Sequence, residues 1–190
     1  VFGTARSPTR TPTGNTLGCG EAAVRCGFCV TDREENMTGK IEERLEDLGI
    51  TLPAASIPQA NYVPYMVTGN LVFIAGQIPI LDGDIMTGKL GDDVDIAFGQ
   101  RGARLCALNL ITQLRAACGG DLDRMTQVVK LGGFVNATPD FTGPPQVMNG
   151  ASDLFVEIFG DIGRHARFAV AVASLPRGAA VEVDGVFEIG

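Results

Sequence analysis

The chain has 190 residues, of which 45% are hydrophobic and 19% are charged, a balance typical of a packed globular protein. No run of about 18 apolar residues occurs, so the sequence predicts no membrane-spanning helix. The formal net charge of −7 argues against nonspecific binding to nucleic acids.

The first 36 residues differ in composition from the rest. They are rich in Thr, Gly, Pro and Arg, show little apolar periodicity, and lack the apolar core of a signal peptide. We interpret residues 1–36 as a disordered leader or a non-native extension, and residues 37–190 as the folded domain. The domain contains few cysteines and no disulfide-like spacing, which favours a reducing, cytoplasmic location.

The elements expected in the domain alternate between strand and helix patterns. In chain order they are a short helix capped by Thr38 and ending near Gly49, strands over 62–67 and 71–75 around a Gly69-Asn70 turn, a helix over 95–117, a strand over 128–136, a helix over 146–159, and strands over 167–174 and 180–188. The stretch from Leu81 to Asp95 is turn-rich. This order predicts an α/β protein of the two-layer α+β kind, with two helices on one face of a sheet. The other face would be covered by self-association.

Arg167 stands at the head of an otherwise small and apolar strand. It shares a strand face with Ala169, Ala171 and Ala173, so its charge has no obvious local partner. Such an arginine either reaches water at the strand end or offers its fork to an anion.

Glu182 lies in a strand whose polar and apolar residues alternate, on the same face as Asp184, Val186 and Glu188. A strand face that is exposed to solvent is the simpler interpretation of this pattern. If the last two strands formed a simple hairpin, Glu182 would lie about five residues, or roughly 16 Å, from the row of Arg167. A pocket shared by the two residues then requires another strand order or a subunit boundary.

Other candidate sites have simpler interpretations. The Cys26-Gly-Phe-Cys29 spacing suits zinc or redox chemistry, but a zinc site needs about four ligands, and His165 is far away in sequence.

The sequence has no recognisable nucleophile motif to act with His165, which is assigned to a helix terminus or the surface. An acidic group of turn and helix-cap residues does not match a calcium loop; its members are Asp82, Asp84, Asp92, Asp93 and Asp95. Gly76 after a strand favours a bulge, and Asn149 an ordinary helix position.

Several short motifs together resemble the RidA family, also called the YjgF or endoribonuclease L-PSP family. They are Val63-Pro-Tyr65, Ala75-Gly-Gln-Ile-Pro79, Asn149, His165-Ala-Arg167, Leu175-Pro176 and Val181-Glu-Val183. The resemblance covers nearly all of 37–190, and the longer N-terminal part indicates a divergent branch. Ala75 and Ala169 stand where many members have a hydroxyl residue and a cysteine, and Phe168 where serine is common.

The resemblance implies a chorismate mutase-like fold, a homotrimer with ligand clefts between subunits, and no metal or organic cofactor. It implies hydrolysis of enamines and imines such as 2-aminoacrylate and 2-iminobutanoate to 2-keto acids and ammonia. Arg167 would bind the substrate carboxylate and Glu182 would activate water and relay a proton.

Four further residues would line the substrate-binding pocket, namely Tyr65, Gly76, Asn149 and Ala169. A noncatalytic trimer that binds small carboxylates or partner proteins is the alternative. A ribonuclease is less favoured, because the chain is acidic and has a single histidine.

Overall fold

The computed structural model describes residues 39–55 and 61–190. The proposed leader, 1–36, and its Cys26-Gly-Phe-Cys29 spacing lie outside the described residues, so the division at residue 37 stays a prediction. None of the helices in the described part is long and apolar enough to cross a membrane.

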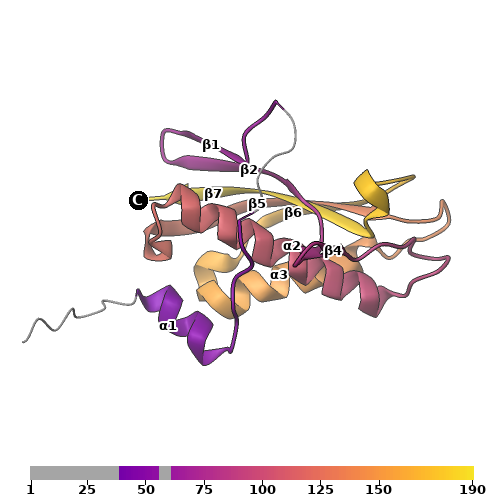
Figure 1. The fold of residues 1–190 in the computed structure, drawn as a ribbon, viewed down its shortest axis with the longest axis horizontal. Coiled ribbons are helices and arrows are strands. Elements are labelled where there is room, and N and C mark those ends of the chain that lie inside the picture. Colours follow the sequence, from indigo (N-terminus) through magenta and orange to yellow (C-terminus); the bar gives the residue numbers. More distant parts are fainter. Residues whose placement is uncertain (1–38, 56–60) are drawn as a thin grey trace, which may run out of the picture. The chain divides into compact units, whose positions relative to one another are not determined.

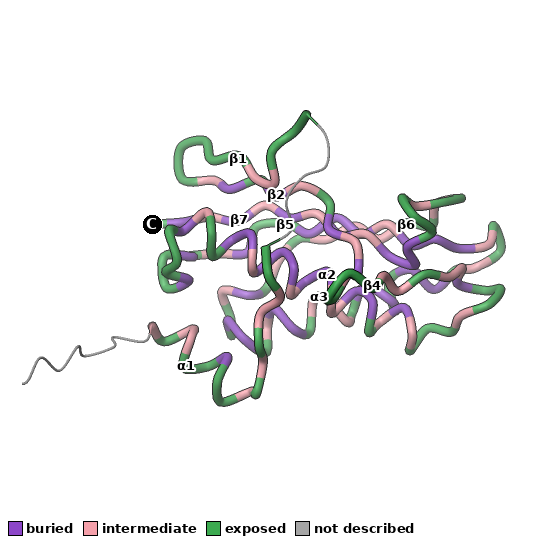
Figure 2. Tube along the Cα trace, in the orientation of Figure 1, coloured by how far each residue is buried: buried purple, intermediate pink, exposed green. Residues whose placement is uncertain are grey.

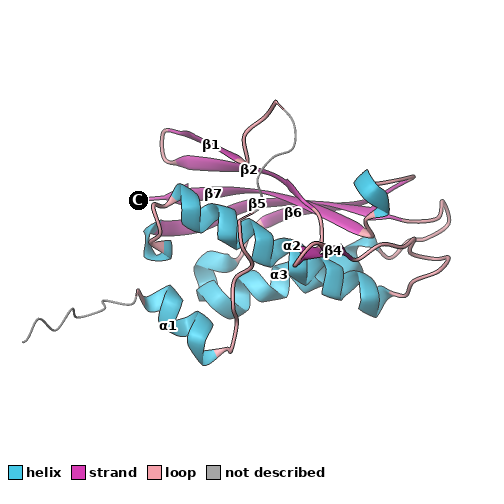
Figure 3. Cartoon of the chain, viewed as in Figure 1, coloured by secondary structure: helices cyan, strands magenta, loops and turns pink. Residues whose placement is uncertain are grey.

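The described residues form three α-helices, a five-stranded sheet and a two-stranded hairpin (Figure 3). The elements are α1 (Lys40–Asp47), β1 (Tyr65–Thr68), β2 (Leu71–Gln77), β3 (Ile80–Leu81), β4 (Asp84–Ile85), α2 (Ile96–Ala117), β5 (Met125–Asn136), α3 (Pro144–Phe159), β6 (Ala166–Val172) and β7 (Val181–Ile189). Short 3₁₀ turns lie at Leu122–Arg124 (η1), Gly160–Gly163 (η2) and Pro176–Gly178 (η3).

The predicted helices and the strands of the main sheet are confirmed, with ends that move by a few residues. Asp95 caps α2 by accepting a hydrogen bond from the backbone N–H of Phe98 at 2.7 Å. Helix α3 begins at Pro144, because prolines in the first helical turn lose no intrahelical hydrogen bond. The turn-rich stretch also contains the β3–β4 hairpin, which is too short for alternation to reveal.

Thr38, the expected cap of the first helix, lies outside the described residues, so this cap stays a prediction. The N-cap position of α1 is Gly39, which has no side chain to offer. The carboxylate of Asp123 instead accepts hydrogen bonds from the backbone N–H groups of Lys40 and Ile41, at 2.9 and 3.0 Å. A distant residue therefore does the work expected of a local cap.

The strand order of the main sheet is β1-β2-β7-β5-β6. Strand β6 pairs parallel with β5, while β7 pairs antiparallel with both β5 and β2. A simple hairpin between the last two strands is therefore wrong, because β5 lies between them. Arg167 pairs with Leu131, which in turn pairs with Gly185.

Helices α2 and α3 cover one face of the sheet, as the sequence predicts (Figure 1). Strand β7 alternates between buried and half-buried residues over its whole length (Figure 2). Its buried members Val183 and Phe187 join Leu110 and Leu114 of α2 in the core. Burying a side chain such as Phe187 contributes about 2–3 kcal/mol to the stability of the folded state. This alternation therefore determines which face of β7 packs against the helices.

No described helix covers the other side of the sheet, which we call the open face. On it, Met66, Phe73 and Val170 are 57%, 44% and 43% exposed. Alternation along β7 places the side chain of Glu182 on this face. The open face therefore combines apolar and carboxylate side chains without cover from the described part of the chain.

Candidate functional site

Arg167 lies at the start of β6 and turns its side chain toward helix α3. Its Nη1 donates hydrogen bonds to Oδ1 of Asn149 at 3.1 Å and to Oγ of Ser152 at 3.0 Å, and its Nη2 donates to the carbonyl of Pro145 at 3.2 Å. No carboxylate of residues 39–55 or 61–190 forms an ion pair with it. The structure thus brings together two residues that the sequence singled out, Arg167 and Asn149.

A guanidinium group carries five N–H donors. Arg167 directs three of them to neutral acceptors, which leaves Nε–H and one N–H of Nη2 without an acceptor among the described residues. The protein thus holds the charge in a fixed orientation without neutralising it. This arrangement favours a guanidinium group that binds an anion over an arginine side chain that is only exposed to solvent at the strand end.

His165 continues the same group of hydrogen bonds. Its Nε2 lies 2.9 Å from Oγ of Ser152, and its Nδ1 lies 2.7 Å from the carbonyl oxygen of Gly163. Burial lowers the pKa of His165; the hydrogen bond to Gly163 raises it, and the charge of Arg167 lowers it further. His165 is therefore half-buried and bonded at both nitrogens, where the sequence indicated a helix terminus or the surface.

Glu182 lies above Gly76 on the open face. The sheet register shifts between Ile74 and Gln77, around the position where the sequence indicated a bulge or a strand end, and β2 continues to Gln77. A Cβ atom at Gly76 would collide with the carboxylate of Glu182, so only glycine leaves room for that side chain. Burial raises the pKa of Glu182, and the nearby charge of Asp184 raises it further.

Asp184 occupies the equivalent place one step along β7. It lies over Gly132 of β5 and accepts a hydrogen bond from the backbone N–H of that glycine. Burial raises the pKa of Asp184, whereas this hydrogen bond and the charge of Lys130 lower it. Glu182 and Asp184 therefore form a pair of half-buried carboxyl groups, each on a neighbouring glycine. Carboxyl groups that resist ionisation are suited to exchanging protons nearer neutral pH than exposed ones.

One chain does not bring Arg167 and Glu182 into a shared pocket. Arg167 contacts α3 on the helix side, whereas Glu182 projects from the open face. Glu182 pairs with Phe134, three residues along β5 from the partner of Arg167 and roughly 10 Å away.

Tyr65 and Ala169, two other predicted pocket residues, lie at opposite edges of the sheet. Tyr65 sits on β1, at the opposite edge of the sheet from β6 and packed against the core, four strand spacings or roughly 19 Å away. Ala169 lies two residues after Arg167 on the same side and is half-buried against the core. The predicted site is thus divided into three parts. Arg167, Asn149 and Ala169 lie at β6 and α3, Gly76 and Glu182 lie on the open face, and Tyr65 lies on the core side of β1.

The residues that depart from the family pattern occupy different faces. Phe168 points to the open face, as predicted, where its ring meets Phe134 edge-on at 5.5 Å and the ammonium group of Lys130 at 5.3 Å. It therefore does not obstruct Arg167. Ala75 lies beside Gly76 in the bulge and offers no hydroxyl group to a ligand.

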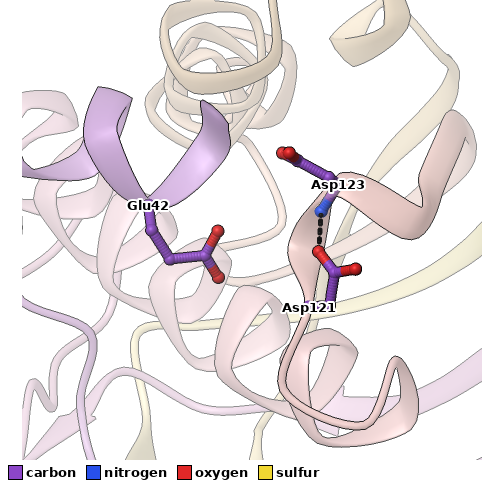
Figure 4. Close-up of side chains that lie close together, drawn as sticks. All are labelled: Glu42, Asp121 and Asp123. Atoms are coloured by element: carbon purple, nitrogen blue, oxygen red, sulfur yellow. Dashed lines mark hydrogen bonds between the residues drawn. The ribbon is translucent and has the colours of Figure 1, made fainter. Parts of the chain in front are cut away.

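A separate acidic cluster joins Glu42 of α1 to Asp121 and Asp123 beside η1 (Figure 4). Oxygen ligands of this kind suit magnesium or calcium. Two of the carboxylates already have structural partners, since Asp123 caps α1 and Asp121 accepts the N–H of Asp123 at 3.0 Å. Nε of Arg115 lies 3.8 Å from Glu42 and supplies countercharge. We assign this cluster to the docking of α1.

Sequence reasoning missed Ser152 and Asp184 as members of these two groups. Ser152 lies three residues after Asn149, the spacing that puts two side chains on one helix face, and this could have linked both to Arg167. Asp184 was recognised only as a neighbour of Glu182, because its contact with Gly132 depends on the pairing of β5 with β7.

Comparisons with known proteins agree with this fold. A model of the family described as "YjgF/chorismate mutase-like, putative endoribonuclease" matches residues 42–185. Protein TCP17 of Trypanosoma cruzi is 51% identical over 154 residues, which cover 80% of this chain and 96% of that protein. A 2-iminobutanoate/2-iminopropanoate deaminase of Dermatophagoides farinae is 28% identical over 142 residues, which cover 74% of this chain and 94% of the relative.

Among solved structures, the crystal structure of Atu1372 from Agrobacterium tumefaciens, a protein with unknown function, is similar at a TM-score of 0.74 and 50% identity. The similarity covers 79% of this chain and 92% of that one. The family match extends over most of the described sheet and both covering helices. The chain therefore belongs to the YjgF/chorismate mutase-like family, which is also the RidA family.

Proposed function

We propose that the protein hydrolyses reactive enamines and imines that carry a carboxylate, of the 2-aminoacrylate and 2-iminobutanoate type, to 2-keto acids and ammonia. Membership of the family supports this proposal, as does a relative named for this activity. The observation that carries it is Arg167, whose guanidinium is fixed by neutral acceptors and keeps two N–H donors for a ligand.

In this proposal Arg167 binds the substrate carboxylate in a bidentate manner through Nε–H and the remaining N–H of Nη2. Asn149 and the carbonyl of Pro145 hold the guanidinium from the opposite side, so little side-chain freedom is lost on binding. Tyr65, Gly76 and Ala169 shape the pocket around the rest of the substrate. No metal or organic cofactor is required.

The chemistry needs a group that gives and takes protons. An enamine first takes a proton from solvent on its terminal carbon and becomes the iminium. Water then adds to the C=N carbon and loses a proton, which moves to nitrogen. The C–N bond breaks to release ammonia as the C=O bond forms and the hydroxyl proton returns to solvent. Glu182 takes the proton from water and passes it to nitrogen. Its raised pKa favours this exchange, because both protonation states become accessible nearer neutral pH.

The site is proposed to form between copies of the chain. Arg167 at the β6 edge of one copy would meet Glu182, Gly76 and Tyr65 of the next, since one chain holds these groups apart. A closed homotrimer would provide this contact three times and cover the apolar part of the open face.

A reducing, cytoplasmic compartment is part of this proposal. Cys106 and Cys118, the cysteines of the described residues, are free and buried. Thiols that stay unpaired are typical of such a compartment.

The activity is tested by mixing the purified protein with a lyase that generates 2-aminoacrylate and following keto-acid release. Wild type should accelerate release above the spontaneous rate, and Arg167→Ala should accelerate it far less. No acceleration by wild type, or equal acceleration by the variant, contradicts the proposal.

A noncatalytic carboxylate-binding protein is the second candidate. Ala75 and Ala169 favour it, because neither can offer a polar group to a reacting substrate. Binding of 2-keto acids at Arg167 without turnover of 2-aminoacrylate would establish this candidate, and measurable turnover would exclude it.

A further inference from the structure

A continuous series of hydrogen bonds leads from Gly163 to Arg167. It runs from the Gly163 carbonyl to Nδ1 of His165 at 2.7 Å, from Nε2 of His165 to Oγ of Ser152 at 2.9 Å, and from Oγ of Ser152 to Nη1 of Arg167 at 3.0 Å. Ser152 belongs to α3, Arg167 lies near the start of β6, and His165 lies directly before that strand. The series forms without any residue of the open face.

The chemistry of each group fixes the direction of these hydrogen bonds. A carbonyl oxygen only accepts, so Nδ1 of His165 carries a proton and donates to Gly163. A guanidinium group only donates, so Oγ of Ser152 accepts from Arg167. While His165 is neutral, its Nε2 accepts, and the hydroxyl proton of Ser152 points to it.

We propose that Ser152 and His165 are positioning residues for Arg167, and that they couple carboxylate binding at Arg167 to protonation of His165. When Nε2 takes up a proton from solvent, it donates to Oγ of Ser152, and the serine hydroxyl is released to turn toward another acceptor. A carboxylate on the Nε–Nη2 edge of Arg167 lies away from Nη1 and Ser152, so it favours this protonated state by offsetting the positive charge of Arg167. The inference rests on the proposed function, because it takes Arg167 as the carboxylate-binding residue.

The surroundings of His165 leave Arg167 as the charge that matters most to it. From α3 it meets Ser152 and, edge-on at 6.1 Å, the ring of Phe155. From η2 it meets the Gly163 carbonyl, while the neighbouring Arg164 pairs with Asp161 at 3.2 Å. Within the described residues, Arg167 is the charged group that acts on the pKa of His165, and it lowers it. An anion on Arg167 offsets that effect, so binding raises the affinity of His165 for a proton.

The free protein provides the first test, because the chain contains a single histidine. In untagged protein, imidazole ¹⁵N spectra of His165 should show the tautomer protonated at Nδ1. They should also show a pKa that rises when Arg167 is changed to Gln and when pyruvate, a 2-keto acid, is added. A Nε2-protonated tautomer, or a pKa that pyruvate leaves unchanged, contradicts the inference.

The second test measures pyruvate binding by calorimetry at about pH 5.5 and about pH 8, and in buffers that differ in ionisation enthalpy. Wild type should bind about fivefold more tightly at the lower pH, the modest end of coupling between two sites, and should take up protons on binding. His165→Gln keeps an acceptor for Ser152 but does not titrate. With Glu182→Gln present in both proteins compared, which removes the other carboxyl group that the proposal places at the site, the affinity of the His165→Gln protein should be the same at both pH values.

Variants of Ser152 separate the relay from a merely nearby charge. Ser152→Ala should weaken the pH dependence although His165 still titrates, because one oxygen no longer holds His165 and Arg167 together. Ser152→Thr, which restores a hydroxyl group, should regain it. Arg164→Gln is the matched control, because it removes a charge next to His165 outside the series, and its pH dependence should equal that of wild type.

The outcomes distinguish the two proposals. The inference is wrong, with the carboxylate site intact, if Arg167→Ala abolishes pyruvate binding while His165→Gln keeps the wild-type pH dependence. The proposed function fails first if Arg167→Ala binds pyruvate as tightly as wild type. A wild-type protein that binds no pyruvate at either pH contradicts both.

Discussion

Arg167 and Glu182 project from opposite faces of one sheet, although β6 and β7 both pair with β5. Arg167 is held against α3 by three hydrogen bonds, and Glu182 lies on Gly76. Neither side chain can reach the other without losing these contacts. We propose that chemistry that uses both residues takes place between two copies of the chain, and the following predictions rest on this proposal.

Replacing Arg167 should remove recognition of the carboxylate. Hydrogen bonds to a charged group contribute about 1.5–3 kcal/mol, so kcat/KM for 2-aminoacrylate should fall roughly 10- to 100-fold in Arg167→Ala. Arg167→Lys keeps the charge but not the fork and should fall in between. Coupled keto-acid assays measure these ratios, and a Lys variant equal to wild type would show that the planar fork is not required.

Gly76→Ala should impair the chemistry more than the fold. The new methyl group would occupy the place of the Glu182 carboxylate, which must then swing away from its seat. Gly102→Ala in α2 is the matched control, because the nearest side-chain atom would lie at an ordinary 3.6 Å from its Cβ. The control should keep full activity and gain about 0.5–1 kcal/mol of stability. Equal activity of Gly76→Ala and wild type would separate Glu182 from catalysis.

Phe73→Glu should dissociate the oligomer. Phe73 is 44% exposed on the open face, so the single chain tolerates a charge there, whereas an interface that buries it does not. Leu81→Glu is the control, since Leu81 is 47% exposed on the separate β3–β4 hairpin. Light scattering should find a smaller assembly for Phe73→Glu only; an unchanged mass in both variants would place the interface elsewhere.

Asp184 should make stability depend on pH. Burial raises its pKa in the folded state, so the stability that its protonated form contributes is fully present below the unfolded pKa of about 3.9 and is lost as pH rises through the folded value. Asp184→Asn keeps an acceptor for the N–H of Gly132 and cannot ionise. It should melt like wild type near pH 3 and at a higher temperature than wild type near pH 7. A lower melting temperature near pH 7 would indicate that the ionised carboxylate has a favourable partner.

The elements of this fold were largely predictable because they depend on local patterns. The alternation of β7, the apolar stripe of α2 and the Gly69-Asn70 turn each follow from neighbouring residues. Strand order was not predictable, because the placement of β5 between β6 and β7 depends on a parallel pairing of distant segments. The contact of Asp123 with the N-terminus of α1 was not predictable for the same reason, since Asp123 is distant in sequence.

The site was predictable residue by residue but not as an arrangement. Alternation along β6 put Arg167 and Phe168 on opposite faces, and the structure confirms this. The same alternation could not say that Ser152 and His165 would hold Arg167, because that contact requires α3 to lie beside β6. Packing between elements, rather than the pattern within one element, decides which polar groups meet.

Complementation between two inactive variants tests the central claim most directly. Arg167→Ala and Glu182→Gln should each keep at most about a tenth of wild-type activity alone, and coexpression at equal amounts should raise it. If each site takes Arg167 from one copy and Glu182 from the next, random assembly leaves about one site in four with both residues, so the mixture should reach roughly a quarter of wild-type activity. A mixture as inactive as its components, with mixed oligomers confirmed by mass spectrometry, would contradict a site shared between subunits.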